Sequence, residues 1–432
     1  MSEIVNIGTC LICSIIMILA SKRIIKGEYC IVDFCLVVFW TMQILPIFLE
    51  KIYGIDDSLG KGTRFYQANS DSEVRLIYGI LMTSIMILLL LLSKIHRKRY
   101  SLNYKGIQHT ISMLKSSKIF QVALCFCMFC PILLVMLAPN PMYYLTYTSI
   151  WKINQIGTIT EKLYHNIVMY FGNNLALVAI FLRYFLKKQK SIMNNVDIII
   201  AIIVMTWVDG KRALFIMAIL GILIVDIILK TYKDRPMAFW GKVFTLILIA
   251  IVFFFEYGRI VGKLQDSSFI TNYSLYFSRM SSTKVSIYDM LHKKEILEYP
   301  GQSIIFDLFF YVPRSLWKNK PSMFTQYFTA YAINSVGFAS WNLHVNIWTE
   351  MIANFGLMLG GIVGIGVTHI IASVSSKSNS LVCQITGMIF IILYYMFGFE
   401  IILMSLFIIW IFTLVLSRFE YKEGRLKLII RR

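Results

Sequence analysis

The stretch WVDGKRALF, residues 207 to 215, interrupts an apolar run that extends from residue 198 to residue 229. It places Asp209, Lys211 and Arg212 within one turn of chain. Each such charge costs roughly 2.5 to 3.5 kcal/mol at the centre of a membrane helix, so a single span holding all three would lose on the order of 8 to 10 kcal/mol. The sequence therefore predicts two membrane helices joined by a tight hairpin, with the charges at its tip.

The composition of the whole chain is that of a polytopic membrane protein. Of its 432 residues, 58% are hydrophobic and 15% are charged, and the mean hydropathy is +0.69, a balance that no soluble globular domain of this size would show. A span needs about 20 apolar residues, and this criterion predicts eleven helices. They lie near residues 4 to 20, 30 to 49, 76 to 93, 119 to 138, 164 to 186, 194 to 208, 213 to 229, 239 to 256, 350 to 373, 381 to 398 and 401 to 417.

Basic residues indicate how these helices are oriented. The opening MSEI has no basic residue, and Lys22 and Arg23 follow the first apolar stretch, an order that is unlike a signal peptide and favours an outer N-terminus. With this orientation the cytoplasmic segments hold 25 of the 42 Lys and Arg residues against 7 acidic residues. Cytoplasmic loops that face anionic lipids therefore explain the net charge of +19, and no nucleic-acid partner is needed.

The predicted helices divide the chain into four regions. Residues 1–255 hold eight membrane helices with short loops, residues 256–349 form one large extracytoplasmic loop, residues 350–417 hold three more helices, and residues 418–432 form a basic cytoplasmic tail. Loops of such length are uncommon unless they have a function. Because the hairpin tip and the large loop share the outer side, we expect the function there.

Eight cysteines lie almost entirely inside apolar runs. The cluster CFCMFC, residues 125 to 130, has no histidine or acidic residue beside it. Small apolar packing residues explain this usage better than a disulfide framework or a metal site, and we expect no metal.

Three cations of the large loop lie in FYVPRSLWKNKP, residues 310 to 321. The preceding SIIFDLFF is too short to span a membrane and suits an interfacial helix, which would bring Arg314, Lys318 and Lys320 near the lipid headgroups. The planar fork of arginine suits a diphosphate. Ordinary anionic headgroups would bind the same cations, and Arg212 could equally be a solvated turn charge.

His344 and Glu350 are the candidate bases, in HVNIWTEMIANFGLMLGG, residues 344 to 361. A neutral imidazole could take a proton from an attacking hydroxyl, although a lone histidine is more often structural. Glu350 could orient His344 or a sugar hydroxyl, or could cap the next helix. Gly356 and Gly360 most simply permit close helix packing.

These segments resemble the Wzy family of O-antigen and capsular repeat-unit polymerases. The shared features are VPRSLWKNKP, the following glutamate, NFGLMLGG at the start of the next helix, a large loop late in a chain of about eleven helices, and GKR in an earlier outer loop. His344, twelve residues before Gly356, is also similar to a histidine of the related O-antigen ligases.

The resemblance implies an all-α, GT-C-like membrane glycosyltransferase that is inverting, metal-independent and free of cofactors. It would polymerise undecaprenyl-diphosphate-linked oligosaccharide repeat units at the outer face of a bacterial plasma membrane, with its C-terminus in the cytoplasm. Membrane lipids and the chain-length regulator and flippase of the same pathway would be its partners. The expected diphosphate ligands are Arg212, Arg314, Lys211, Lys318 and Lys320, and the expected base is His344 or Glu350.

Other functions remain open from the residues. Asp56 and Asp57 could hold a divalent metal for a lipid-monophosphate sugar donor, although GIDDSLGKG is typical of a simple turn. A flippase or exporter would show pseudo-symmetric halves and a charged central cavity, whereas carboxylates are scarce near the middle of the predicted spans. A ligase-type glycan transferase and a structural scaffold are the remaining alternatives.

Overall fold

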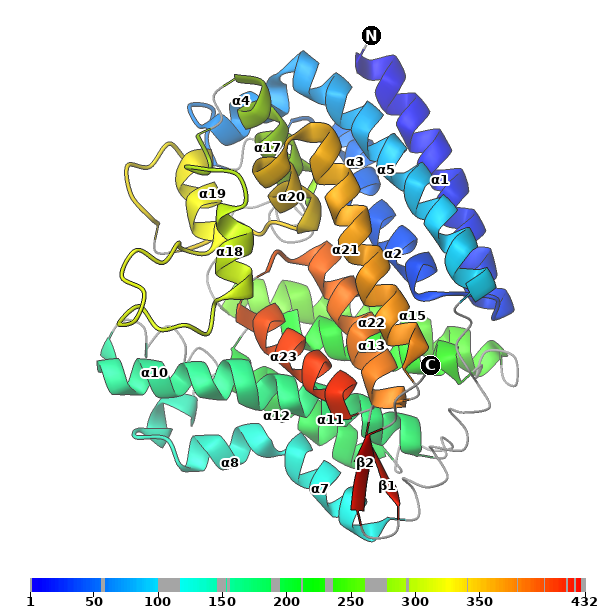
Figure 1. Cartoon of the computed structure of the whole chain (residues 1–432), viewed down its shortest axis with the longest axis vertical. Helices are drawn as coiled ribbons and strands as arrows, with labels where there is room; N and C mark the ends of the chain where they lie inside the picture. The colour runs from blue at the N-terminus through cyan, green and yellow to red at the C-terminus, as the bar shows by residue number, and fades with distance from the viewer. Residues whose placement is uncertain are drawn as a thin grey trace. The chain divides into compact units, whose positions relative to one another are not determined.

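The structure is a computed structural model that describes residues 2–55, 59–99, 117–145, 153, 156–187, 195–210, 213–229, 236–260, 278–292, 295–339, 341–378, 380–399, 401–416, 419–422 and 425–428. The chain forms two compact units (Figure 1). Unit 1 comprises Met1–Leu102, Ser267–Ser378 and Cys383–Arg432, and unit 2 comprises Asn103–Asp266 and Asn379–Val382. Over the described residues the fold is helical, as predicted, with one short antiparallel hairpin near the C-terminus.

Unit 1 begins with three long helical segments and ends with two further helices and a short β-hairpin. Its N-terminal elements are α1 (Ser2–Lys26), α2 (Ile31–Phe39), the π-helical turn η1 (Trp40–Ile44), α3 (Leu45–Tyr53), α4 (Arg64–Ser70) and α5 (Ser72–Arg99). Its later elements are α17 (Met280–His292), α18 (Gln302–Leu308), α19 (Phe324–Ala332), α20 (Ile347–Phe355), α21 (Leu357–Lys377), α22 (Leu381–Met396), α23 (Ile401–Leu416), β1 (Phe419–Lys422) and β2 (Arg425–Leu428).

Unit 2 consists of helices alone in its described part. They are α7 (Lys118–Met128), α8 (Cys130–Met136), the 3-10 turn η2 (Pro141–Leu145), α10 (Ile159–Ile167), the π-helical turn η3 (Val168–Gly172), α11 (Asn173–Leu186), α12 (Val196–Asp209), α13 (Ala213–Ile228) and α15 (Pro236–Ile260). Between α12 and α13, Gly210 adopts a left-handed conformation with φ 61°, which glycine adopts without strain. Helices α12 and α13 pack against each other across this short connection, as the predicted hairpin requires, while its cations Lys211 and Arg212 lie outside the described residues.

Five helical segments among the described residues are long and apolar enough to cross a membrane. They are Ser2–Lys26, Ile31–Ile52, Ser72–Arg97, Ile159–Leu186 and Leu357–Lys377. The other predicted spans correspond to the bent pair α7 and α8 and to shorter apolar helices within α12, α13, α15, α22 and α23. The sequence therefore located the apolar helices, and their length and composition are compatible with a multi-pass membrane protein.

The predicted continuous helix at 119 to 138 is wrong in one respect, because α7 and α8 meet at an angle of 57°. Pro131 lies in the first turn of α8. A proline has no backbone N–H, and its ring displaces the carbonyl one turn earlier, so a straight helix cannot continue through it. The bend follows from that residue.

The predicted continuous helix at 350 to 373 is also corrected, because the chain reverses at Gly356. This residue has φ 81°, a conformation that favours glycine, and α20 folds back along the first half of α21. A Cβ on Gly360 would lie 2.5 Å from the carbonyl oxygen of Met351, and one on Gly364 would lie 2.6 Å from the Trp348 ring. These two glycines permit the antiparallel contact, so the predicted role of Gly360 in close packing is confirmed.

Helix α22 packs against the second half of α21, beyond the part that α20 covers. The hydroxyls of Tyr395 and Thr368 are 2.9 Å apart, so α22 ends beside the middle of α21. Trp348 at the start of α20 packs edge-to-face on Tyr395, with ring centroids 5.4 Å apart. The two shorter helices α20 and α22 thus follow one another along the single long helix α21.

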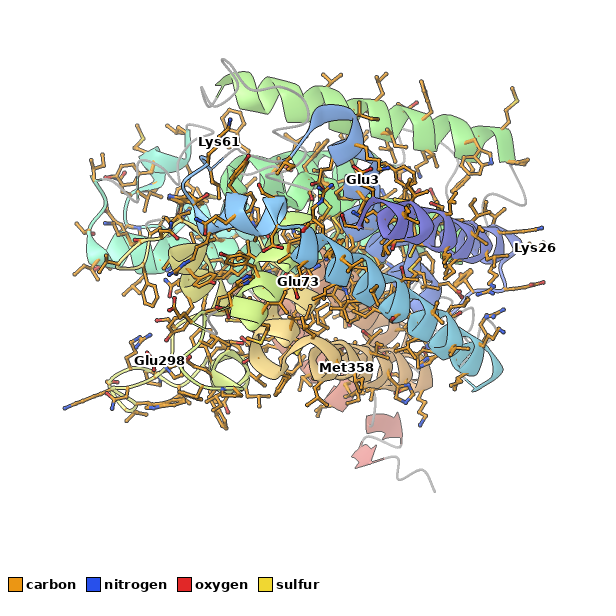
Figure 2. The ribbon with its side chains drawn as sticks, turned by 90° about the horizontal axis from the view of Figure 1, so that it is seen from above. Glu3, Lys26, Lys61, Glu73, Glu298 and Met358 are labelled. Atoms are coloured by element: carbon orange, nitrogen blue, oxygen red, sulfur yellow. The ribbon has the colours of Figure 1, made fainter. Side chains whose placement is uncertain are left out.

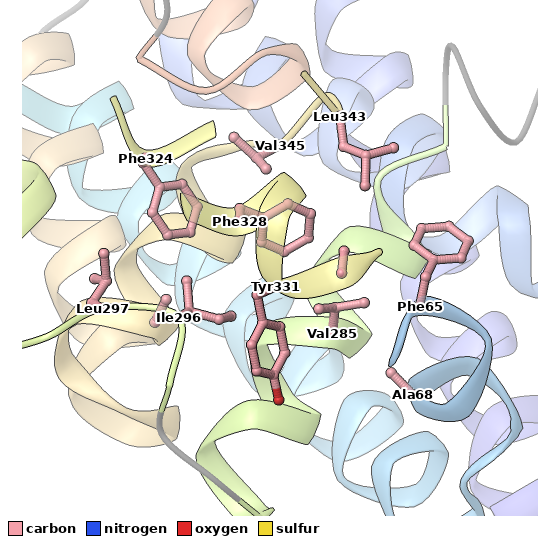
Figure 3. Packing of buried hydrophobic residues seen from close by; sticks show 12 residues of the cluster. Phe65, Ala68, Val285, Ile296, Leu297, Phe324, Phe328, Tyr331, Leu343 and Val345 are labelled. Atoms are coloured by element: carbon pink, nitrogen blue, oxygen red, sulfur yellow. The ribbon is translucent and has the colours of Figure 1, made fainter. Parts of the chain in front are cut away.

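The segment predicted as one large loop folds into helices. Between residues 278 and 355 it forms α17, α18, α19 and α20, around a core that also includes Phe65 and Ala68 of α4. Figure 3 shows Phe324 and Phe328 of α19 among the side chains of this cluster. Burial of such side chains contributes roughly 1.5 to 3 kcal/mol each, which explains how a segment between membrane helices acquires a defined structure.

Charged residues mark the two ends of the long helices of unit 1. Figure 2 shows Glu3 and Lys26 at opposite ends of α1. At the Lys26 end, Arg23 lies 3.3 Å from Asp33 of α2, which also accepts a hydrogen bond of 2.7 Å from Ser93 of α5. At the other end, Glu50 lies 2.7 Å from Lys284 of α17. Asp33 and Glu50 therefore mark the two ends of the second membrane segment, and the depth of other residues can be given by their distance from these two.

Candidate functional site

Two of the predicted loop cations hold their own loop together. Arg314 donates hydrogen bonds to the carbonyl oxygens of Lys320 (2.8 Å) and Pro321 (3.2 Å). The Lys320 ammonium donates to the carbonyl oxygens of Phe310 (2.6 Å) and Val312 (2.8 Å). Burial, and then the charge of Arg314, lowers the pKa of Lys320. These contacts give both cations a structural role in closing the loop between α18 and α19.

The other predicted cations are either exposed or undescribed. Lys318 is exposed on the same loop. Lys211 and Arg212 lie outside the described residues, as do Asp56 and Asp57 of the alternative metal site. The structure therefore does not bring the five predicted diphosphate ligands together within its described part.

Glu350 lies in a buried polar cluster. Its carboxylate accepts hydrogen bonds from the hydroxyls of Ser303 (2.7 Å) and Tyr394 (3.4 Å), and its side chain is fully buried. Asn354 donates to the same Ser303 hydroxyl at 2.7 Å. Asp307 of α18 is the second carboxyl here, and burial together with the charge of Glu350 raises its pKa well above its usual range. These contacts connect α18 with α20 and α22, and they leave the Glu350 carboxylate buried among its hydrogen-bond partners.

His344 lies in the extended segment that leads into α20. Its carbonyl oxygen accepts a hydrogen bond of 2.8 Å from the hydroxyl of Ser282 on α17. Its ring meets Phe397 edge-to-face, with centroids 5.7 Å apart and planes at 80°. His344 is of intermediate exposure, whereas Glu350 is fully buried.

Arg279, which sequence reasoning missed, lies against the same phenylalanine. Its guanidinium carbon is 5.5 Å from the centroid of the Phe397 ring, and its side chain is among the largest that are fully buried. Nε donates to the carbonyl oxygen of Met396 (2.5 Å) and Nη1 to that of Ser278 (2.8 Å). Since Met396 is the last residue of α22, the cation also meets the negative end of that helix dipole.

A distorted turn in the second membrane segment holds the backbone of Arg279. Pro46 stands four residues after Met42 and has no N–H to donate to the Met42 carbonyl, so the α-helical pattern fails there. The chain forms the π-helical turn η1 instead, and the Met42 carbonyl accepts the N–H of Arg279 at 2.9 Å. Such turns are frequent at functional sites.

The neighbouring Gln43 extends this anchor. Its side chain donates to the hydroxyl of Thr283 (3.1 Å), and its carbonyl oxygen and side-chain oxygen both accept from Tyr78 of α5 (2.7 Å each). Buried hydrogen bonds of this kind fix a unique arrangement because leaving one unmade costs roughly 1 to 3 kcal/mol. The start of α17 is thereby fixed relative to α2 and α5.

Arg279 lies about halfway along the membrane helices of unit 1. Its N–H meets Met42, which is nine residues from Asp33 and eight from Glu50. At 1.5 Å per residue these separations are roughly 13 Å and 12 Å. A buried guanidinium at such a depth is costly and marks a functional site by default.

Together Arg279 and His344 could perform acid–base and anion chemistry. A guanidinium stabilises negative charge that develops on a phosphate leaving group, and a neutral imidazole accepts a proton from a hydroxyl. The only sequence signal for Arg279 is its place, with Lys284, in a segment that otherwise carries no charge before Asp289. In a solvated loop an arginine is ordinary, so the sequence alone did not indicate that Arg279 is functional.

No protein-family model matches this chain, and neither does any curated protein or solved structure.

Proposed function

We propose that the protein is an inverting, metal-independent glycosyltransferase of the Wzy type. It polymerises undecaprenyl-diphosphate-linked oligosaccharide repeat units into surface polysaccharide at the outer face of a bacterial plasma membrane. The proposal includes eleven membrane spans in a GT-C-like arrangement, with the N-terminus outside and the C-terminus in the cytoplasm. In this orientation the Glu50 end of unit 1 faces outward.

The observation that carries the proposal is the meeting of Arg279 and His344 on Phe397. Transfer from a lipid diphosphate needs a cation for the leaving group and a base for the attacking hydroxyl, and these two residues supply both. Their place between α17, α20 and α22 of one unit explains how residues 65 positions apart in the sequence could act on one substrate.

The proposed reaction is a single displacement at the anomeric carbon of the donor glycan. His344 takes the proton of an acceptor hydroxyl on a second lipid-linked unit, and that oxygen forms the new bond to the anomeric carbon. The bond from this carbon to the diphosphate oxygen breaks, and the electron pair leaves with the undecaprenyl diphosphate. Arg279 stabilises the charge that develops on this oxygen, an effect exerted mainly on the transition state.

His344 is the better candidate for the base than Glu350. Both oxygens of Glu350 are hydrogen-bonded within the buried cluster with Ser303 and Tyr394, whereas His344 is of intermediate exposure. A base must come within hydrogen-bond reach of the substrate hydroxyl. We therefore assign Glu350 a positioning role, in which it holds α20 against α18.

The test is deletion of the gene in its host, with complementation by wild type, Arg279→Lys and His344→Ala. Surface glycan is separated by electrophoresis, and lipid-linked sugars on each side of the membrane are identified by mass spectrometry. Single repeat units that accumulate outside, without a ladder, support polymerisation. Units trapped inside would mean a flippase, and a normal but unattached ladder would mean a ligase.

A further inference from the structure

We propose that the N-terminal ends of α17 and α20 form a binding subsite for a phosphate-type oxyanion beside Arg279. The identity of this oxyanion as the diphosphate of the substrate rests on the proposed function. The subsite itself does not. Its existence is argued from the contacts of residues at the starts of these two helices.

The two helices begin side by side. The Ser282 hydroxyl in the first turn of α17 donates to the carbonyl oxygen of His344, just before α20. The hydroxyl of the next residue, Thr283, is 3.1 Å from that of Thr349 in the first turn of α20. The first N–H groups of a helix have no partner within it and carry partial positive charge, which attracts anions. Two such ends lie together here, and Arg279 immediately precedes one of them.

Asn346 provides the evidence that a ligand belongs there. It is the N-cap of α20, and its side-chain oxygen accepts from the N–H and the hydroxyl of Thr349 at 3.0 and 2.9 Å. This fixes the orientation of the amide, so that Nδ2 points away from the helix backbone. Asn346 is only 1% exposed, and within the described part of the chain its Nδ2 has no hydrogen-bond partner. A buried donor left unpaired costs roughly 1 to 3 kcal/mol, so an acceptor is expected there.

Ser281, the second residue of α17, is a further donor of this kind. Its side chain is 3% exposed, and its hydroxyl has no partner among the residues that the structure describes. By contrast, the hydroxyls of Ser282 and Ser286 on the same helix donate to carbonyl oxygens at 2.8 and 2.9 Å. Both helix starts therefore present an unsatisfied buried donor.

The charges around the two helix starts select an anion. Glu50 is paired with Lys284, and Glu350 is bound by Ser303 and Tyr394. Within the described residues, donors gather at the two helix starts. They are the Arg279 guanidinium, which also donates to the carbonyl oxygens of Met396 and Ser278, the Asn346 amide, the Ser281 hydroxyl and helix N–H groups. This is the chemistry that binds phosphate oxygens. A prenyl diphosphate, a phospholipid headgroup and free phosphate share it.

The decisive variant is Asn346→Asp in the purified full chain. Aspartate keeps the oxygen that accepts from Thr349 and is as good an N-cap as asparagine, so thermal stability should be unchanged. Its second oxygen replaces Nδ2 and repels an anion. We expect calorimetry to show that farnesyl diphosphate and inorganic pyrophosphate bind wild type and bind Asn346→Asp at least about tenfold more weakly. Asn195→Asp, the same change at the N-cap of α12, is the matched control and should leave binding intact.

The outcomes separate the subsite from the proposed function. Wild-type binding by Asn346→Asp, or a fall in its thermal stability that accounts for the lost binding, would overturn the subsite. Equal competition by phosphatidylglycerol micelles and by farnesyl diphosphate would identify a lipid-headgroup site and overturn the link to the substrate. Weakened anion binding together with a wild-type polymer ladder in cells would leave the subsite standing and reject the function proposed for it.

Discussion

The ring of Phe397 contacts both the Arg279 guanidinium and the His344 imidazole. A conservative change at Arg279 should therefore show whether activity needs only the positive charge or also the planar shape of the guanidinium. Arg279→Lys keeps the positive charge but removes the planar fork and the hydrogen bond from Nε to Met396. Loss of one preorganised donor to a developing anion costs roughly 10²- to 10³-fold in rate. We expect the polymer ladder to fall by at least that lower factor in membranes with matched protein levels.

Arg314→Lys serves as the comparison for Arg279→Lys. Its cation ties the loop through the carbonyl oxygens of Lys320 and Pro321, so the change should loosen the loop while leaving most transfer intact. A ladder lost equally in both variants would contradict the assignment of Arg279 as the leaving-group cation.

Asp307 makes stability depend on pH. Burial raises its pKa, so the folded chain keeps a proton that the unfolded chain releases once the pH exceeds the ordinary carboxyl range. The folded state is therefore most stable at low pH and loses stability as the pH rises toward the raised pKa. Asp307→Asn imitates the protonated carboxyl, so the melting temperature of this variant should depend less on pH than that of wild type between about pH 5 and pH 8. An unchanged slope would show that Asp307 is already ionised.

At the scale of elements, the π-helical turn η1 is the connection between the second membrane segment and Arg279. Pro46→Ala restores an N–H to the helix, which can then claim the Met42 carbonyl from Arg279. The variant should lose transferase activity while the free energy of unfolding changes by about 1 kcal/mol or less. Pro236→Ala, at the first residue of α15, removes a proline where no helical donor is missing, and it should retain activity. Full activity of Pro46→Ala would exclude the turn as a positioning device.

The antiparallel contact of α20 with α21 can be tested with two glycines of one helix. A Cβ at Gly360 would lie 2.5 Å from the backbone oxygen of Met351, whereas nothing lies within 4 Å of a Cβ at Gly366. Gly360→Ala should therefore destabilise the protein by about 1 to 3 kcal/mol. Gly366→Ala should be neutral or stabilising, because alanine favours a helix. Thermal unfolding in detergent measures both, and equal melting temperatures would contradict the fold-back of α20.

For the whole molecule, cysteine labelling tests the proposed orientation. Val336, between α19 and α20, and Lys377, at the end of α21, are both exposed. In a background with the exposed Cys125 replaced by alanine, a membrane-impermeant maleimide should label Val336→Cys on intact cells. It should label Lys377→Cys only after permeabilisation. The reverse pattern would invert the topology.

The sequence predicted where apolar helices lie, because twenty consecutive apolar side chains have one stable environment. It also predicted the hairpin between α12 and α13, since three charges cannot lie in a span. It did not predict the bend at Pro131 or the reversal at Gly356, because a window of hydropathy averages over single residues. The conformations of those residues decide whether an apolar run is one helix or two.

The candidate site was predicted only in part. His344 was chosen from its residue type and its distance to a glycine-rich helix, but Arg279 was not, because no motif surrounds it in the sequence. Its burial comes from Met42, Met396 and Phe397, which are all far from it along the chain. Contacts of this kind depend on how α17, α2 and α22 pack.

The sequence by itself determined where the apolar helices lie and that they suit a multi-pass membrane protein, because hydropathy and charge act locally and need no knowledge of packing. Only the tertiary structure decided that α17, α19 and α20 also form in or next to the predicted outer segment, and that α17 starts beside Met42 of the second membrane segment. It also decided that Lys320 closes a loop while Arg279 meets His344. How deep a side chain lies, which groups it contacts and how far it is buried depend on residues that are distant in sequence. These contacts are defined only once the helices have packed.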